Sequence, residues 1–225
     1  MTDNEPPYRN RIDAGRVLAE HLKHYKSGDA VVFAIPRGGI PVAVEVAKKL
    51  GCELDVIVSR KISIPFNTEA GYGAVTEDGA IVLNEPLVKQ LRFTRQQIER
   101  HAEAVRAEIR RRQSVYRAIL SPSSVEGKTA IIIDDGLASG YTMMAAIRSM
   151  RQQGAGKVVV AVPVASSSAW ELVKSAADEL VSPIVSYHYP FAVAGFYREW
   201  HDLSDEEVIK DLDRYAKDME GHAND

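Results

Sequence analysis

The sequence has little that points to a secreted or membrane protein. Cys52 is the only cysteine among 225 residues, which excludes an intrachain disulfide and a zinc site built from several cysteines. No apolar run approaches the roughly 20 residues of a membrane-spanning helix, and the opening MTDNEPPYRNRIDAG lacks the apolar core of a signal peptide. We therefore expect an intracellular, cytoplasmic protein with no membrane partner.

An excess of charge of one sign is also missing. The formal net charge is -3 and the isoelectric point about 6.1, so the chain offers no overall basic field for nucleic acid. The composition, 45% hydrophobic and 26% charged, is that of an ordinary globular protein. We expect a folded chain that binds a small molecule and no nucleic acid, with any anion site confined to one locality.

Short apolar runs alternate with segments of helical periodicity along most of the chain. The runs predict buried strands at 30–35, 53–60, 128–134, 157–163 and 180–186, with helices at about 12–25, 41–50, 140–153 and 168–177. Strands that alternate with helices build parallel sheets. The sequence therefore predicts an α/β fold with a doubly wound, mostly parallel sheet.

The middle and the end of the chain depart from this alternation of strands and helices. Residues 61–73, rich in Gly, Pro and Asn, predict a long loop, and Asp78-Gly79 predicts a hairpin. Capping boxes predict a charged helix from Thr94 to about residue 120 and a last helix from Ser204 to about residue 218. The arginines of the charged helix are typical of a solvated face: Arg106, Arg110, Arg111 and Arg112.

Two adjacent carboxylates stand where a buried strand ends, in the stretch AIIIDDGLASGYTM (130–143). The small-residue loop after them leads into a helix, whose free N–H groups and dipole suit a phosphate. Asp134 and Asp135 can accept hydrogen bonds from a vicinal diol or reach a hard cation. A sugar phosphate would satisfy both halves of the stretch. The alternative is that Asp134 only ends the strand and Asp135 caps the helix.

These residues resemble a known family. Four apolar residues, two acids and a loop ending in Gly-X-Thr are similar to the signature of the type I phosphoribosyltransferases, and IPRGG (35–39) resembles their pyrophosphate loop. The resemblance runs from the strand at 30–35 to that at 180–186 and is closest to a group whose acceptor is unassigned. It implies one domain over 1–225, with a core at about 28–187, a hairpin and long-helix insertion, a small hood from about 1–12 and 188–225, and a homodimer.

The resemblance also assigns roles within this sequence. Asp134 and Asp135 would hold the ribose hydroxyls of phosphoribosyl pyrophosphate (PRPP), with Arg37 and Lys61 completing the catalytic set. Its 5-phosphate would lie on Ala138, Ser139, Gly140, Tyr141 and Thr142, where Tyr141 replaces the usual Gly or Ala. Its pyrophosphate would lie on Arg37, Gly38, Gly39, Arg60 and Lys61, with a cis non-proline peptide next to Arg37 and the loop after Lys61 closing over the site. For Arg60 and Lys61 a plain surface pair is the alternative.

The end of the chain is dense in aromatic residues, as a stacking site for a planar acceptor would need: Phe191, Phe196, Tyr197 and Trp200. Packing within the protein is the alternative for each of them. The six histidines have no ligand spacing, so no metal site built by the protein alone is expected. The resemblance implies Mg²⁺ carried by PRPP, with Asp134 and Asp135 nearby.

The sequence thus favours a PRPP-dependent pentosyltransferase of nucleotide metabolism. It would move ribosyl 5-phosphate from Mg-PRPP to a nitrogen acceptor, such as a nucleobase, and release pyrophosphate. A regulator that binds PRPP or a nucleotide at the same site without turnover is the main alternative, because one fold can serve both uses. A phosphoester hydrolase is a weaker one, since no nucleophile or metal-ligand cluster is evident.

Overall fold

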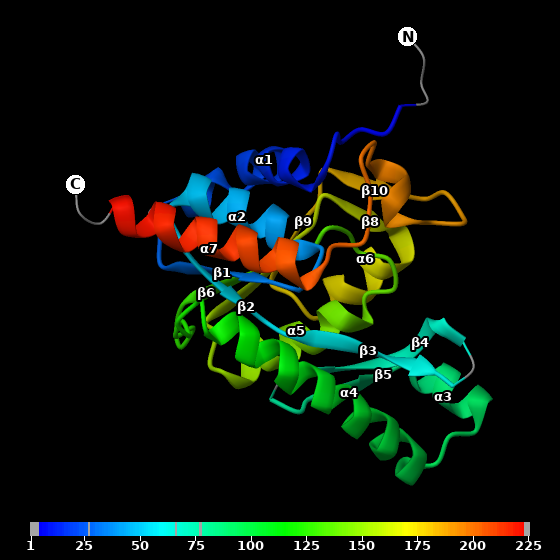
Figure 1. Ribbon diagram of the computed structural model, residues 1–225. Coiled ribbons are helices and arrows are strands. Elements are labelled where there is room, and N and C mark those ends of the chain that lie inside the picture. The colour runs from blue at the N-terminus through cyan, green and yellow to red at the C-terminus, as the bar shows by residue number, and fades with distance from the viewer. Residues whose placement is uncertain (1–4, 27, 66, 77, 223–225) are drawn as a thin grey trace.

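Five parallel strands form the central sheet of the computed structural model, which describes residues 5–222 except 27, 66 and 77 (Figure 1). The strand order is β2–β1–β6–β7–β9. The bounds are β1 Ala30–Ala34, β2 Glu53–Val56, β6 Thr129–Ile133, β7 Lys157–Ala161 and β9 Glu179–Val181. Every neighbouring pair is parallel, so the predicted α/β fold with a mostly parallel sheet is confirmed.

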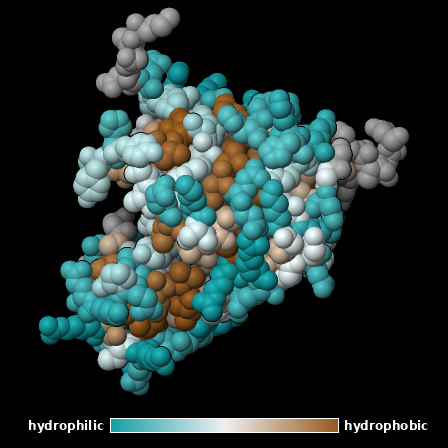
Figure 2. Space-filling model, turned by 180° about the vertical axis from the view of Figure 1, so that it is seen from behind, coloured by the Kyte–Doolittle hydropathy of each residue, from teal (hydrophilic) through white to brown (hydrophobic). Residues whose placement is uncertain are grey.

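Helices cover both faces of this sheet, which explains why its strands are continuous apolar runs. One face carries α1 (Arg11–His21), α2 (Gly39–Leu50) and α7 (Asp205–His222), and the other carries α5 (Tyr141–Gln152) and α6 (Ser167–Lys174). Side chains of β6 alternate between the two layers: Ile131 and Ile133 pack in the first, and Ile132 packs in the second. On the face drawn in Figure 2, apolar side chains reach the surface in patches bordered by hydrophilic ones. Within the described ranges, no helix is long and apolar enough to span a bilayer.

The insertion is a second, antiparallel sheet of β3 (Ser59–Ile64), β4 (Asn67–Thr76) and β5 (Ile81–Leu83), followed by α3 (Glu85–Leu91) and α4 (Arg95–Arg117). The hairpin predicted at Asp78-Gly79 joins β4 to β5. The prediction of a long loop at 61–73 is wrong, because β3 and β4 pair across that segment with an irregular register. Glycine in β4 is a packing requirement, since a Cβ at Gly73 would lie 2.5 Å from the carbonyl oxygen of Val82.

Two predicted strands are each divided. The strand predicted at 53–60 ends at Val56, and Arg60 belongs to β3 of the second sheet. The strand predicted at 180–186 is broken around Pro183 into β9 and β10 (Ile184–Ser186), and β10 pairs in parallel with β8 (Val164–Ser166). Both predicted capping boxes are present, at Thr94 and at Ser204.

The N-terminal arm lies beside the segment that follows β10. The N–H of Tyr8 donates to the carbonyl of Phe196 at 3.1 Å, and the N–H of Arg198 donates to that of Tyr8 at 3.0 Å. Phe196 ends a short 3₁₀ helix, η2 (Val193–Phe196), and another, η1 (Lys23–Tyr25), follows α1. Thus the described parts of the two predicted hood segments touch, while residues 1–4 and 223–225 of that prediction lie outside the described residues.

Candidate functional site

The two adjacent acids follow β6 directly, at the edge where the parallel strands end. Asp134 Oδ1 accepts the N–H of Asp135 at 2.9 Å, and Asp135 Oδ2 accepts Nε of Arg11 at 2.8 Å. The helix after them begins only at Tyr141, with Gly140 as its N-cap and no side-chain cap. Asp135 therefore does not cap this helix, and the capping alternative for it is wrong.

Arg11 ties the acid pair to the segment after β10. Its Nη1 donates to the carbonyl of His201 at 3.0 Å, and its guanidinium carbon lies 3.8 Å from the ring centre of Trp200. The hydroxyl of Tyr197 donates to the backbone carbonyl of Asp135 at 2.6 Å. The sequence analysis missed Arg11, because it lies in a polar arm whose pattern carries no signal for a long-range ion pair.

The loop after the acids is held through its carbonyl groups. The N–H of Ser166 donates to Leu137 O at 2.8 Å, and its Oγ donates to Ala138 O at 2.7 Å. Gly140 has φ of 81°, in the left-handed region that glycine adopts without strain. Among the residues that the structure describes, the N–H groups of Ala138, Ser139 and Gly140 have no hydrogen-bond acceptor. The loop therefore presents donors just before a helix N-terminus, as anion binding requires.

The PRGG loop packs directly on the acid pair. A Cβ at Gly39 would lie 2.6 Å from the carbonyl oxygen of Ile133, and a Cβ at Gly38 would collide with the carboxylate of Asp135. The two glycines are thus needed for close approach between the loops. The expected cis peptide is present, between Pro36 and Arg37. Arg37 forms an ion pair with α7, where its Nη1 lies 3.6 Å from Asp205 Oδ1.

Arg60 and Lys61 line a groove of about 420 Å³ between β3 and α4. Nη1 of Arg60 donates to Glu108 Oε1 at 3.0 Å, whereas Lys61 is exposed. The structure thus joins the acid pair, the small-residue loop and the PRGG loop, and it places Arg60 toward α4. Contacts from α4 were not foreseen, although the four-residue spacing of Glu108 and Arg112 indicates a helical ion pair.

The acid pair has unusual electrostatics. Burial raises the pKa of the Asp134 carboxyl well above its usual range, and the charge of Asp135 raises it further. Burial also raises the pKa of Asp135, although the Arg11 guanidinium opposes that rise. The free protein therefore holds the proton of Asp134 more tightly than an exposed carboxyl would, and a cation bound there would favour the ionised form.

The four aromatic residues proposed for stacking fall into two groups. Tyr197 is only 3% exposed, and Trp200 is covered by Arg11, so both are engaged in internal packing. Phe191 and Phe196 have ring centres 5.5 Å apart and line a pocket of about 480 Å³ beside β10. Of the four, these two remain able to meet a ligand.

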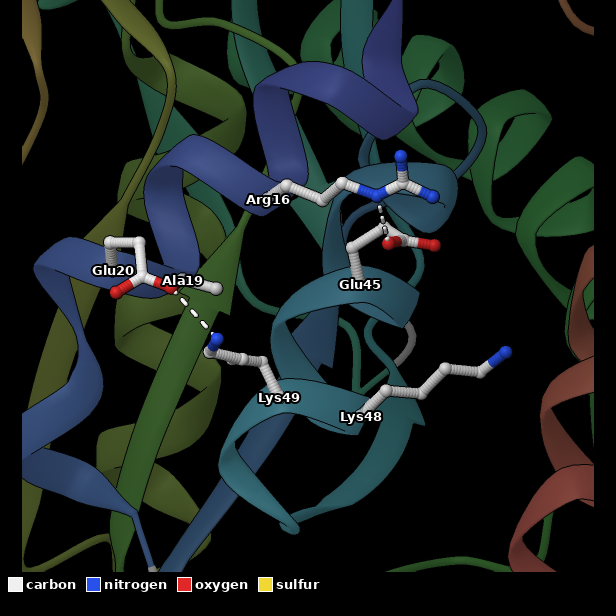
Figure 3. A pocket seen from close by; sticks show the side chains of 6 residues that line it. All are labelled: Arg16, Ala19, Glu20, Glu45, Lys48 and Lys49. Carbon is white, nitrogen blue, oxygen red and sulfur yellow. Dashed lines mark hydrogen bonds and ion pairs between the residues drawn. The ribbon is translucent and has the colours of Figure 1, made fainter.

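Two other features bear on ligands. Within the described part of the chain, no three His, Cys, Asp or Glu side chains group as a metal site, but carboxylates beside a phosphate-type loop are the oxygen donors that suit Mg²⁺. The charged residues that line a groove of about 430 Å³ between α1 and α2 are all paired: Arg16 with Glu45 at 2.9 Å, Glu20 with Lys49 at 2.9 Å (Figure 3), and Lys48 with Asp218 of α7 at 2.5 Å. That groove offers no unmatched charge for a ligand.

Comparison with known proteins shows that the chain belongs to the phosphoribosyl transferase family. The family model described as "Phosphoribosyl transferase domain" matches residues 9–197, which include both loops and the acid pair. This confirms the family to which the sequence motifs pointed.

Individual relatives are similar over most of this chain. The Mycobacterium tuberculosis protein named "Putative phosphoribosyl transferase Rv0571c" is 38% identical over 212 residues, which cover 94% of this chain and 48% of that protein. The chain thus spans about half the length of the curated relatives it matches. The crystal structure of TT1426 from Thermus thermophilus is 39% identical, with a TM-score of 0.77, and the match covers 92% of this chain and 98% of that one.

Replacing Gly38 by Ala tests the close approach between the PRGG loop and Asp135. The backbone of Gly38 is helical (φ -59°, ψ -34°), so any effect arises from the added methyl group. We expect the free energy of unfolding to fall by about 1–3 kcal/mol in urea titrations, because the carboxylate must leave Arg11 or the loop must shift. Gly195→Ala is the control, since a Cβ there meets nothing within 4 Å. Equal stability of the two variants would contradict the packing.

Replacing Asp134 by Asn tests whether this carboxyl is kept at a cost to the fold. Its raised pKa means that the folded chain binds more protons than the unfolded chain above the unfolded pKa of about 3.9. The contribution of Asp134 to the free energy of unfolding therefore falls as the pH rises above about 3.9, whereas Asn does not titrate. We expect Asp134→Asn to gain on the wild type toward pH 8, by up to about 1.4 kcal/mol per pH unit traversed, in urea titrations.

Asp178→Asn is the control of opposite sign. Arg151 and the N–H of Val158 lower the pKa of Asp178, so its contribution is present above the unfolded pKa and is lost in acid. This variant should be less stable than the wild type at pH 8 and approach it as the pH falls. A difference in stability between Asp134→Asn and the wild type that stays constant from acid pH to pH 8 would contradict the raised pKa and show that the ionised carboxyl costs the fold nothing.

Proposed function

We propose that this chain transfers ribosyl 5-phosphate from Mg-PRPP to a nitrogen acceptor and releases pyrophosphate. The observation that carries the proposal is the contact of Gly38 with the carboxylate of Asp135, directly before a loop of free N–H donors. A phosphate site, a diol site and a leaving-group loop are then neighbours, and PRPP carries a 5-phosphate, a ribose diol and a pyrophosphate in that order. Membership of the phosphoribosyl transferase family supports this use.

The acids and the small-residue loop divide the ribose phosphate between them. Asp134 and Asp135 accept hydrogen bonds from the ribose hydroxyls, and Asp135 uses Oδ1 because Oδ2 holds Arg11. N–H groups from Ala138 to Thr142, with the hydroxyls of Ser139 and Thr142, hold the 5-phosphate. Burial raises the pKa of the Tyr141 hydroxyl, so this side chain stays neutral and adds no negative charge beside the phosphate.

The PRGG loop serves the leaving group. As the bond from C1 to pyrophosphate breaks, negative charge grows on the departing oxygens, and preorganised donors there lower the barrier. Arg37 supplies a charged fork, and Gly38 and Gly39 let the backbone come close; Arg60 and Lys61 approach from β3. Mg²⁺ bound with PRPP supplies further neutralisation of the leaving group, within reach of the acid pair.

The acceptor lies in the pocket of Phe191 and Phe196 in this proposal. Two rings of the predicted hood segment line this pocket and suit a planar nitrogen heterocycle, so a nucleobase is the favoured acceptor. The family resemblance extends the proposal to a homodimer that acts in the cytoplasm. A regulator that binds PRPP without turnover remains the rival, because Arg11 already occupies one oxygen of Asp135.

A pyrophosphate-release screen tests the proposal. Purines, pyrimidines and small amines are each incubated with Mg-PRPP and the protein, and a reaction without acceptor measures hydrolysis. We expect one acceptor class to release pyrophosphate in step with nucleotide formation, and Asp134→Asn to lose most of this activity because ribose is no longer positioned. PRPP binding without turnover across the panel would favour the regulator, and no binding would contradict both.

A further inference from the structure

Asp135 is held by side chains from both ends of the chain. Nε of Arg11 donates to Asp135 Oδ2 at 2.8 Å, and the hydroxyl of Tyr197 donates to the backbone carbonyl of Asp135 at 2.6 Å. The ring of Trp200 covers the guanidinium of Arg11, with 3.8 Å from the ring centre to the guanidinium carbon. The ring centres of Tyr197 and Trp200 lie 5.1 Å apart. We call Arg11, Tyr197 and Trp200 the clamp.

Arg11 is fixed by more than its ion pair. It is the first residue of α1, and the side chain of Asn10 caps that helix by accepting the N–H of Asp13 at 3.1 Å. Nη1 of Arg11 donates to the carbonyl of His201 at 3.0 Å, and the whole residue is only 7% exposed. A planar guanidinium that is held at Nε, at Nη1 and over its face keeps one orientation.

The clamp leaves one carboxylate oxygen of Asp135 to a ligand. Oδ2 and the backbone carbonyl are occupied, whereas no N–H group of the described residues donates to Oδ1. The side chain remains 14% exposed, so solvent reaches it. The charge of Arg11 opposes the rise in the pKa of Asp135 that burial causes, and an ionised carboxylate acts only as an acceptor. Oδ1 is thus an acceptor that points in a fixed direction.

Fold stability alone is a weak reason for this arrangement. Two charges removed from water lose hydration, and their mutual attraction offsets that loss only in part. The pair also joins residues 124 positions apart, so it fixes how the N-terminal arm meets the end of β6. Its clearest effect is therefore on geometry, and the group whose geometry it sets belongs to the candidate site.

We propose that Arg11 is a positioning residue for ribose recognition, which fixes Asp135 so that Oδ1 accepts a hydrogen bond from one hydroxyl of the ribose diol. This rests on the function proposed above, and it adds to the site a residue that lies outside both sequence motifs. Arg11 acts through Asp135 and does not itself touch the sugar. Hydrogen bonds to a charged acceptor are strong, but they weaken steeply when their alignment is lost.

The test measures what the diol contributes to binding. One probe is anhydroribitol 5-phosphate, the ring of ribose 5-phosphate without its C1 hydroxyl, and the other is tetrahydrofurfuryl phosphate, which also lacks the diol. Each is titrated calorimetrically into the full chain, without metal and at fixed ionic strength. The Kd of the second probe divided by that of the first is the diol factor, and we expect about 10 or more for the wild type.

Arg11→Gln should lower the diol factor, because Asp135 loses its fixed direction. We expect a fall of at least about 5-fold, whereas a merely structural role of Arg11 predicts that both probes weaken equally and the factor stays constant. Arg9→Gln is the control. Arg9 lies in the same arm, but its ion pair with Glu199 is exposed, so this variant should leave the diol factor within about 2-fold.

Arg11→Lys separates geometry from charge and serves if Arg11→Gln folds poorly. Lysine keeps a positive charge beside Asp135, but its single ammonium cannot reproduce the fork and the flat face that meet His201 and Trp200. We expect a folded protein, checked by urea titration, with a diol factor at least about 3-fold below that of the wild type.

The outcomes separate this inference from the proposed function. A diol factor that is unchanged in Arg11→Gln and Arg11→Lys overturns the inference, while the assignment of the acid pair to ribose stands. A factor that falls in Arg11→Gln but is restored in Arg11→Lys shows that charge acts without fixed geometry, and this also overturns the inference. A wild-type factor near one overturns both the ribose assignment and the inference.

Discussion

The ion pair between Arg11 and Asp135 holds together the parts of the molecule that build the site. Its two side chains are 8% and 14% exposed, and an ion pair removed from water is stable only when further hydrogen bonds satisfy both groups. Here the carbonyl of His201 and the ring of Trp200 satisfy Arg11, and Gly38 packs on the carboxylate. The N-terminal arm, the chain after β10, the PRGG loop and the end of β6 are thereby fixed to one another.

The same surroundings make the ionised carboxylate of Asp134 unfavourable for folding. A carboxyl whose pKa is raised by burial and by an adjacent acid opposes folding at neutral pH, and fold stability alone gives no reason to keep it. The neighbouring loop explains its presence, since donors for a phosphate lie beside acceptors for a diol. Acids beside phosphate donors suit a ligand that carries both hydroxyls and a phosphate.

Local patterns in the sequence predicted much of the fold. The parts that depend on pairing between distant segments could not be predicted from such patterns. The apolar runs of β1, β6 and β7 and the capping boxes at Thr94 and Ser204 are signals within a few residues, and all are confirmed. The β3–β4 hairpin was missed because its glycines resemble those of a loop. In the structure, Gly73 is required by close packing against the neighbouring strand β5. For the site, the motifs found both loops and the acid pair. The ion pair of Arg11 was missed because its partner lies 124 residues away, and the burial of the Arg112 side chain was missed because it depends on how α4 packs against β3.

The central claim is that the acid pair holds the ribose of PRPP, and equilibrium binding tests it without requiring an acceptor. Calorimetric titration of Mg-PRPP into the wild type, into the Asp134→Asn, Asp135→Asn double variant and into the Asp178→Asn control gives three dissociation constants. The account predicts that the double variant binds at least about 10-fold more weakly, while the control matches the wild type. A double variant that is folded and binds Mg-PRPP as tightly as the wild type would contradict it.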